Sequence, residues 1–354
     1  MAIISDDEGM ERRVKKNPIV KPETIEYDNT FESSIRPKDF ESYIGQGALK
    51  ETLKITLEAA KKRGKPLDHL LFYGPPGLGK TTIAGVIASQ MGVEIRITSA
   101  PALERPRDII GILMSLKGGE ILFIDEIHRL NKVAEEILYP AMEDFTLDMT
   151  TGKSQTAKTL RVPLPKFTLI GATTKAGELS SPLRDRFGMI HRLEFYTVEE
   201  LAQVVERTAK ILEVEITEEG AKAIAMRSRG TPRIANRLVK RVSDFAIVKY
   251  DGVIDKRVAN ESLDILKIDE FGLDNTDRAL LSLIINKYDG GPVGIETIAA
   301  ALSEDVRTIE DVCEPYLLQA GLLQRTPRGR KVSPEGYRHL GIKMPSEQRR
   351  LFDD

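Results

Sequence analysis

Residues 74–81 read GPPGLGKT, which matches the GxxxxGK[ST] spacing of a phosphate-binding loop. An apolar segment from His69 to Tyr73 precedes the loop and a helix-forming segment follows it, as the motif requires. Gly74, Gly77 and Gly79 allow backbone N–H groups to surround phosphate oxygens, and the following helix adds its positive dipole end. The pattern therefore predicts a site for a nucleoside triphosphate.

The side chains that follow these glycines have separate expected roles. Lys80 supplies a cation for the β- and γ-phosphates, and the hydroxyl of Thr81 binds Mg²⁺. Thr82 contacts phosphate from the start of the helix. The alternative is a glycine-rich turn that matches by chance, and the order of strand, loop and helix disfavours it.

Polar residues end two further apolar segments. Residues 120–126, EILFIDE, end in Asp125, which can hold Mg²⁺ through water, and Glu126, which can polarise the attacking water. The alternative is an exposed pair of acids at a strand end. Residues 167–174 end in two threonines at the same edge of the sheet, where open α/β folds bind ligands. Thr174 could sense the γ-phosphate, although such a pair taken alone is usually part of a turn.

Adenine is the expected base. The Asn131-Lys132 pair near these motifs lacks the aspartate of the NKxD pattern that binds guanine. We therefore expect ATP with Mg²⁺ as the bound cofactors.

Two arginine-containing segments are candidates for contact with the γ-phosphate. In SPLRDRF, residues 181–187, one arginine could reach the site of a neighbouring subunit as an arginine finger. A solvated helix with an Arg–Asp pair is the alternative. Arg233 follows Thr231-Pro232 at an expected helix start, where a cation suggests an anionic partner. Residues 221–243 carry seven basic residues and no acid, most of them expected at the solvated surface or in pairs between subunits, with contact to nucleic acid as the second alternative.

The elements that must position these residues fall into three blocks. Residues 31–196 alternate apolar strands with helical segments, the pattern of a parallel α/β sheet. Residues 197–267 have helical periodicity throughout and predict a small helical domain. Residues 270–343 predict three helical segments and a hairpin. An arm, residues 1–30, and a tail, residues 344–354, receive no role.

Composition bounds the class of protein. The net charge is −2, so nucleic acid would need a local basic patch. Residues 322–350 provide one, with eight Lys and Arg against two Glu, a local charge of +6.

Disulfides and structural zinc are disfavoured by the single Cys313 and by four scattered histidines. Cys313 is expected to be a small buried hydrophobic residue. With no segment apolar enough to span a membrane, we expect a cytoplasmic protein and no membrane partner.

The phosphate loop, DEIH, GATT, RDRF and GTPRIANR, in this order, resemble the AAA+ ATPases, and nearly the whole chain is similar to their RuvB family of branch-migration motors. The resemblance implies a P-loop sheet with a helical lid and a C-terminal winged-helix domain. It also implies a homohexamer that drives duplex DNA through four-way Holliday junctions with RuvA, in recombination and repair, with RuvC as a further partner. The hairpin expected around residues 147–165, with its tip at 151–153, resembles the part that docks RuvA.

The same resemblance implies roles residue by residue. Arg186 would be the finger acting on the neighbouring subunit, and Arg233 the second sensor. The implied catalytic residues are Lys80, Asp125, Glu126, Thr174 and Arg186, with Thr81 and Asp125 on the metal. The implied ATP-binding residues are Ile35, Arg36, Gly74, Gly77, Gly79, Lys80, Thr81, Thr82, Glu143, Asp144, Phe145, Arg186, Tyr196 and Arg233. The implied DNA-binding residues, on an exposed wing, are Arg325, Arg328 and Arg330.

Two other functions share parts of this pattern. A clamp loader or an unfoldase would have the same ATP site, but the winged-helix tail disfavours both. A DNA-binding regulator that binds ATP and turns it over little is the alternative from another class, and Glu126 and Arg186 disfavour it.

Overall fold

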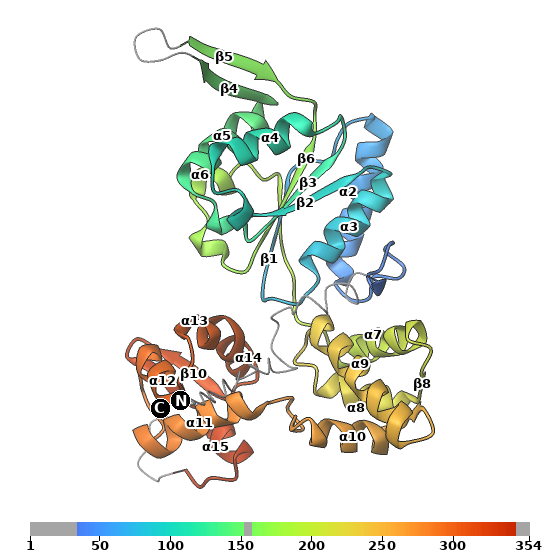
Figure 1. The fold of residues 1–354 in the computed structure, drawn as a ribbon, viewed down its shortest axis with the longest axis vertical. Helices are drawn as coiled ribbons and strands as arrows, with labels where there is room; N and C mark the ends of the chain where they lie inside the picture. Colours follow the sequence, from blue (N-terminus) through green and yellow to red (C-terminus); the bar gives the residue numbers. More distant parts are fainter. Residues whose placement is uncertain (1–33, 152–157, 345–354) are drawn as a thin grey trace, which may run out of the picture.

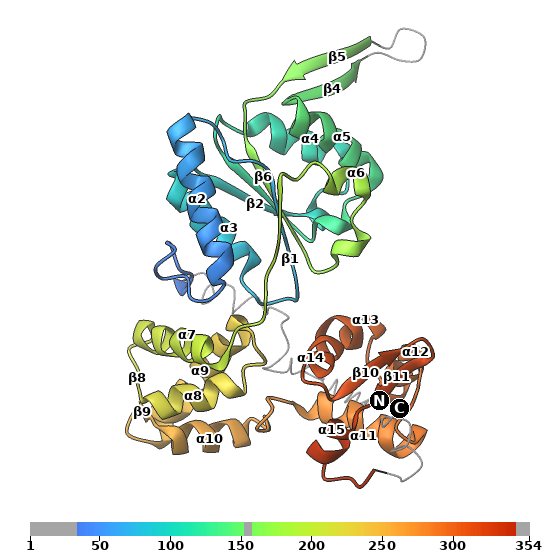
Figure 2. The ribbon, with the colours of Figure 1, turned by 180° about the vertical axis from the view of Figure 1, so that it is seen from behind.

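A computed structural model of the chain describes residues 34–151 and 158–344. The predicted arm, the tip of the predicted hairpin and all of the predicted tail except Met344 lie outside the described residues. Figures 1 and 2 show a large α/β unit, with a helical unit and a C-terminal unit lying side by side at one end of it.

The large unit is built on a parallel sheet with the strand order β2-β3-β6-β1-β7. Strands β3 and β6 are apolar because both faces of the sheet are covered, and β6 is buried at every position. β7 was not expected from the sequence, since its burial alternates and its residues include His191 and Arg192. The strands are β1 (Leu70–Tyr73), β2 (Ile95–Ser99), β3 (Ile121–Asp125), β6 (Thr168–Thr173) and β7 (Met189–Arg192).

Helices cover both faces of this sheet (Figure 1). One layer contains α2 (Gly47–Arg63) and α3 (Lys80–Met91), and the other contains α4 (Pro106–Ser115), α5 (Lys132–Glu143) and α6 (Ser181–Arg184). Among the described residues, this unit also contains short 3₁₀ turns at Ala100–Ala102, Ile127–Arg129 and Ala176–Glu178.

An antiparallel hairpin projects from the far end of the large unit, away from the other two units (Figures 1 and 2). It pairs β4 (Thr146–Thr151) with β5 (Lys158–Pro163), which confirms the predicted hairpin.

The helical unit contains α7 (Val198–Ile211), α8 (Glu218–Met226), α9 (Pro232–Lys249) and α10 (Lys256–Ile265). A capping box starts α7, because Thr197 accepts from the Glu200 N–H at 3.2 Å and the Glu200 carboxylate accepts from the Thr197 N–H at 2.9 Å. A short parallel pair, β8 (Glu215–Ile216) and β9 (Val253–Ile254), joins the connection between α7 and α8 to the connection between α9 and α10.

The C-terminal unit has its own apolar core, in which Cys313 is buried as expected. It is a winged helix, with a hairpin after a group of helices. Its elements are α11 (Asn275–Tyr288), α12 (Ile295–Leu302), α13 (Val306–Thr308), a π-helical turn (Ile309–Cys313), α14 (Glu314–Gln319), β10 (Leu323–Thr326), β11 (Gly329–Val332) and α15 (Pro334–His339). No helix among the described residues is long and apolar enough to cross a membrane.

Candidate nucleotide site and basic wing

The loop between β1 and α3 has the backbone that the glycine spacing predicts. Gly74 and Gly77 have φ values of 140° and 83°, and a Cβ on Gly74 would lie 2.8 Å from the carbonyl oxygen of Leu193. Only glycine fits there without a shift of the backbone. The loop therefore brings peptide groups to the N-terminus of α3, where an anion is favoured.

Lys80 is the first residue of α3, and its side chain folds back over the loop. Nζ donates to the carbonyl oxygens of Gly74 at 2.8 Å and Pro75 at 3.0 Å. Burial lowers the pKa of Lys80 from 10.5 to about 8, although Asp125 and Glu126 oppose the shift. A buried cation without an adjacent ion pair is costly, and phosphate oxygens would compensate it.

The two acids lie where β3 ends. Asp125 is the last residue of the strand, and its Oδ1 accepts from the Glu126 N–H at 3.0 Å. The Glu126 carboxylate accepts from the Thr174 hydroxyl at 3.2 Å, which joins the ends of β3 and β6. Nδ1 of His128 lies 3.2 Å from the same carboxylate oxygen, and burial lowers the pKa of this histidine against the charges of Glu126 and Glu178. These contacts hold Glu126 at the edge of the sheet.

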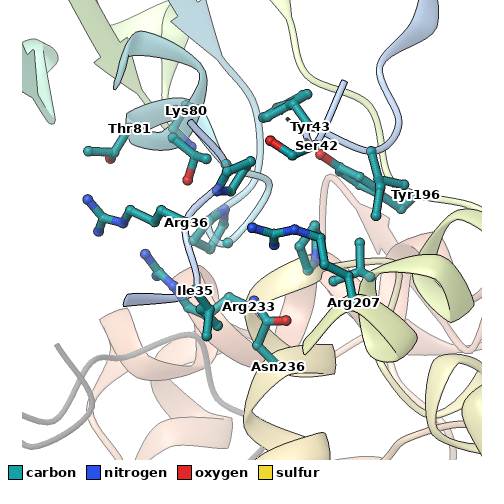
Figure 3. Close-up of a pocket in the computed structure, with 18 of the residues that line it drawn as sticks. Ile35, Arg36, Ser42, Tyr43, Lys80, Thr81, Tyr196, Arg207, Arg233 and Asn236 are labelled. Carbon is teal, nitrogen blue, oxygen red and sulfur yellow. Dashed lines mark hydrogen bonds between the residues drawn. The ribbon is translucent and has the colours of Figure 1, made fainter. Parts of the chain in front are cut away.

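These groups line one cavity between the large unit and the helical unit, with about 980 Å³ of empty space, part of it open to solvent (Figure 3). The helical unit closes it with α7 and α9, and the Arg233 N–H donates to the carbonyl oxygen of Gly77 at 3.4 Å. Of the predicted residues, those that line it are Ile35, Arg36, Gly77, Gly79, Lys80, Thr81, Thr82, Asp125, Glu126, Thr174, Tyr196 and Arg233.

Arg186 and residues 143–145 do not line this cavity in the single chain described, so their predicted contact with ATP stays a prediction. The Arg186 guanidinium lies 3.1 Å from the Glu143 carboxylate and 4.3 Å from the centre of the Tyr139 ring. Asp144 is exposed at the end of α5, and Phe145 turns inward, with its ring centre 5.8 Å from that of Phe167. Gly74 also lies outside the cavity lining, and its carbonyl oxygen accepts from Nζ of Lys80.

The wing is the hairpin of β10 and β11. Arg328 is exposed in the turn between them, and Arg325 is exposed on β10 with its Nη2 3.2 Å from Glu310. Arg330 lies on β11, but it is only 8% exposed, which does not support its predicted contact with DNA. Its guanidinium donates to both oxygens of the buried Glu314, at 3.0 and 2.8 Å. Arg330 therefore supports the base of the wing in this structure.

Family models match nearly all of the described chain. The Holliday junction DNA helicase RuvB P-loop domain matches residues 35–193, the RuvB AAA lid domain 196–269, and the RuvB C-terminal winged helix domain 270–341. The chain belongs to the RuvB family. Its large unit is therefore a P-loop ATPase domain that binds nucleotide, and its helical unit is the lid.

Individual relatives of the RuvB family agree with this assignment. The chain is 58% identical to the Holliday junction branch migration complex subunit RuvB of Crocosphaera subtropica over 354 residues, 100% of both chains. It is 59% identical to that of Nostoc punctiforme over 335 residues, 94% of this chain and 92% of the relative. The solved Thermotoga maritima RuvB Holliday junction branch migration motor is 50% identical and superposes with a TM-score of 0.80, covering 88% of this chain and 99% of that one.

Several residues of the RuvB site were not predicted from the sequence. Tyr43 lies in an irregular segment, and Arg207 occupies a helix position that reads as solvated, so neither gave a signal. Asn236 did give one, since it follows Arg233 by three residues and must share its helix face. Tyr43 also contacts Tyr196, with their hydroxyl oxygens 3.4 Å apart.

The basic run over residues 221–243 is less solvated than expected. Arg229 and Arg237 are buried, and Arg229 forms an ion pair with the buried Asp277 of the winged helix. Arg227 bonds Asp264 of α10 at 3.2 Å. Part of this run therefore joins elements within one chain.

Proposed function

We propose that this chain is the ATP-driven motor of a Holliday junction branch migration complex and moves duplex DNA through four-way junctions together with RuvA. The observation that carries the proposal is a nucleotide cavity closed by the lid of the same chain, joined to a winged helix with an exposed basic wing. The match of all three units to the RuvB family supports it.

In this proposal the phosphate loop and Lys80 hold the phosphates of ATP. A hydroxyl and a carboxylate that face one cavity, from Thr81 and Asp125, fit the oxygen ligands that Mg²⁺ prefers. The ion would neutralise charge on the β- and γ-phosphates. Glu126 orients and deprotonates the attacking water, Thr174 positions Glu126, and Arg233 reports the γ-phosphate to the lid.

Arg186 completes the site of a neighbouring subunit. It supplies the charge that stabilises the transferring phosphoryl group, and the exposed Glu143 and Asp144 lie on the same outward face. A closed ring of identical subunits gives every finger a site, so we propose a homohexamer.

Further contacts follow from the exposed parts of the chain. Arg325 and Arg328 bind DNA phosphates without base specificity. The projecting β4–β5 hairpin docks RuvA, and RuvC is a further partner. We place the domain limits at 31–196, 197–267 and 270–343, between the arm and the tail.

The deciding experiment is migration of a synthetic four-way junction with ATP and Mg²⁺, with and without RuvA. Movement of the junction is expected in the presence of RuvA, and Lys80→Ala, as the matched control, should abolish it. ATP hydrolysis without junction movement in either condition would refute the motor and favour a loader or an unfoldase. Tight DNA binding with negligible hydrolysis would favour a nucleotide-switched regulator.

A further inference from the structure

The π-helical turn Ile309–Cys313 contacts the ATPase domain and the wing with neighbouring side chains. Asp311 lies 3.4 Å from Nζ of Lys175, and Glu310 lies 3.2 Å from Nη2 of Arg325. π-helical turns occur mainly as single interruptions of α-helices, often at functional sites. Two adjacent acids thus connect the edge of the central sheet with a predicted DNA contact.

Lys175 belongs to the end of β6 that carries the candidate γ-phosphate sensor. It directly follows Thr174, whose hydroxyl donates to Glu126 at 3.2 Å. Its own N–H donates to the hydroxyl of Thr173 at 2.9 Å. A shift of Thr174 toward a γ-phosphate would therefore displace Lys175 as well.

A second ion pair joins the winged helix to the lid. The Arg229 guanidinium bonds the Asp277 carboxylate of α11, and Nε donates to the carbonyl oxygen of Gly272 at 2.7 Å. Arg229 stands in the loop that leads to Arg233, which itself contacts the phosphate loop. Each of these two ion pairs thus involves a segment that leads directly to a residue of the nucleotide site.

The two ion pairs differ in how easily they break. The side chains of Arg229 and Asp277 are 3% and 1% exposed, and separation would leave a buried charge uncompensated. Those of Lys175 and Asp311 are 35% and 47% exposed, so water replaces much of their interaction when they separate. The first pair resists opening far more than the second.

The winged helix also packs on the phosphate loop itself. A small cavity is lined jointly by Pro75 and Pro76 of the loop, Thr231 of the lid, and Val312 and Pro315 of the winged helix. Both views show α13 and α14 as the part of the winged helix turned toward the large domain (Figures 1 and 2). Movement here would rotate the wing as well, since Glu310 lies in the same turn.

We propose that Lys175 and Asp311 form a latch that the nucleotide opens, while Arg229 and Asp277 form the pivot about which the winged helix then turns. The proposal rests on the proposed motor function and adds how the γ-phosphate state reaches the wing. Engagement of Thr174 withdraws Lys175 from Asp311, and Glu310 carries Arg325 with it. Lys175 is a positioning residue, since it lies outside the cavity lining.

The test measures energy transfer between dyes on Lys132→Cys of the large domain and Glu335→Cys of the winged helix, both exposed positions. Cys313 is buried and stays in place. Labelled chains are diluted with unlabelled full-length chains so that transfer stays within one subunit. A slowly hydrolysed ATP analogue should change the transfer in the otherwise native chain. Lys175→Glu should shift the nucleotide-free signal toward the analogue-bound value. The equilibrium constant between the closed and the open Lys175–Asp311 pair should change by up to about fivefold, the largest effect expected from the loss of an exposed ion pair.

The charge-exchanged chain Lys175→Glu with Asp311→Lys should restore the native response, which an effect of Lys175 through its other neighbour Glu178 would not predict. Asp311→Asn provides a second, milder opening of the latch. Lys222→Glu, which breaks an exposed ion pair within α8, is the matched control and should leave the transfer unchanged.

The latch is refuted if the analogue leaves the native transfer unchanged, or if Lys175→Glu and Asp311→Asn both respond like the native chain. It is also refuted if the charge exchange fails to restore the response. These outcomes differ from failure of the proposed function, because the transfer requires only nucleotide binding. A chain with a working latch that moves no junction would refute the motor alone.

Discussion

At the scale of single residues, Lys80 combines burial with charge. Its pKa of about 8 is set by desolvation, and bound phosphate would raise it by adding negative charge. Binding then takes up a proton once the pH exceeds the pKa of the free protein. Affinity for ATP therefore has its full value below pH 8 and decreases as the pH rises above 8.

We expect the affinity for an ATP analogue to fall by up to about tenfold per pH unit above pH 8. Titrations between pH 7 and 9.5, in buffers of different ionisation enthalpy, should also detect proton uptake. Lys80→Ala should bind weakly at every pH and lose this slope. A native affinity independent of pH over this range would contradict the proposed role of Lys80.

Arg186 gives a second prediction at this scale. If it acts on the neighbouring site, mixing Arg186→Ala subunits with Lys80→Ala subunits should restore part of the ATP turnover that each variant lacks alone, because the intact site of the first variant can then receive Arg186 from the second. Steady-state turnover across mixing ratios measures this. Lys132→Ala, an exposed change on the same domain, is the control. Mixtures that stay without turnover would show that Arg186 acts only within its own chain.

At the scale of elements, we expect different arginines of the wing to contribute to folding stability and to DNA binding. Arg330→Met leaves the buried Glu314 with only the more distant and exposed Arg325, at 3.8 Å, which should lower the free energy of unfolding by up to about 3–5 kcal/mol. Arg328→Ala removes an exposed charge and should leave stability nearly unchanged. Chemical denaturation of the two variants checks this difference. Equal stability of the two variants would contradict the supporting role of Arg330.

Most elements followed from residue patterns. The phosphate loop, the acid-ended β3 and the helices of the lid depend on local spacing, which a sequence displays directly. β7 was missed because an edge strand with alternating burial lacks the apolar run of a central strand. Arg330 was misplaced because spacing gives the wing its arginines but not the buried Glu314 that pairs with one of them.

At the scale of the whole molecule, the placement of domains depends on contacts that no local pattern shows. Asp277 and Arg229 are separated by 48 residues, and both read as surface charges in the sequence. Residues 143–145 were expected in a nucleotide pocket, whereas in the single chain Glu143 lies beside Arg186, outside the cavity lining. Prediction of the site was therefore strongest within one chain and weakest where a second chain or domain completes it.

Truncation tests which domains bind nucleotide and which domain binds duplex DNA. The cut belongs after Asp269 rather than earlier, because Ile268 is buried in the lid core. The shortened chain should bind the ATP analogue with at least native affinity, since no described residue beyond Asn236 lines the nucleotide cavity. It should lose duplex binding, because the exposed wing arginines are absent. In the full chain, Arg325→Ala with Arg328→Ala should lower the slope of log affinity against log salt by about two, one for each phosphate contact. Duplex affinity that survives truncation would place the DNA contact in the ATPase domain or the lid instead of the wing.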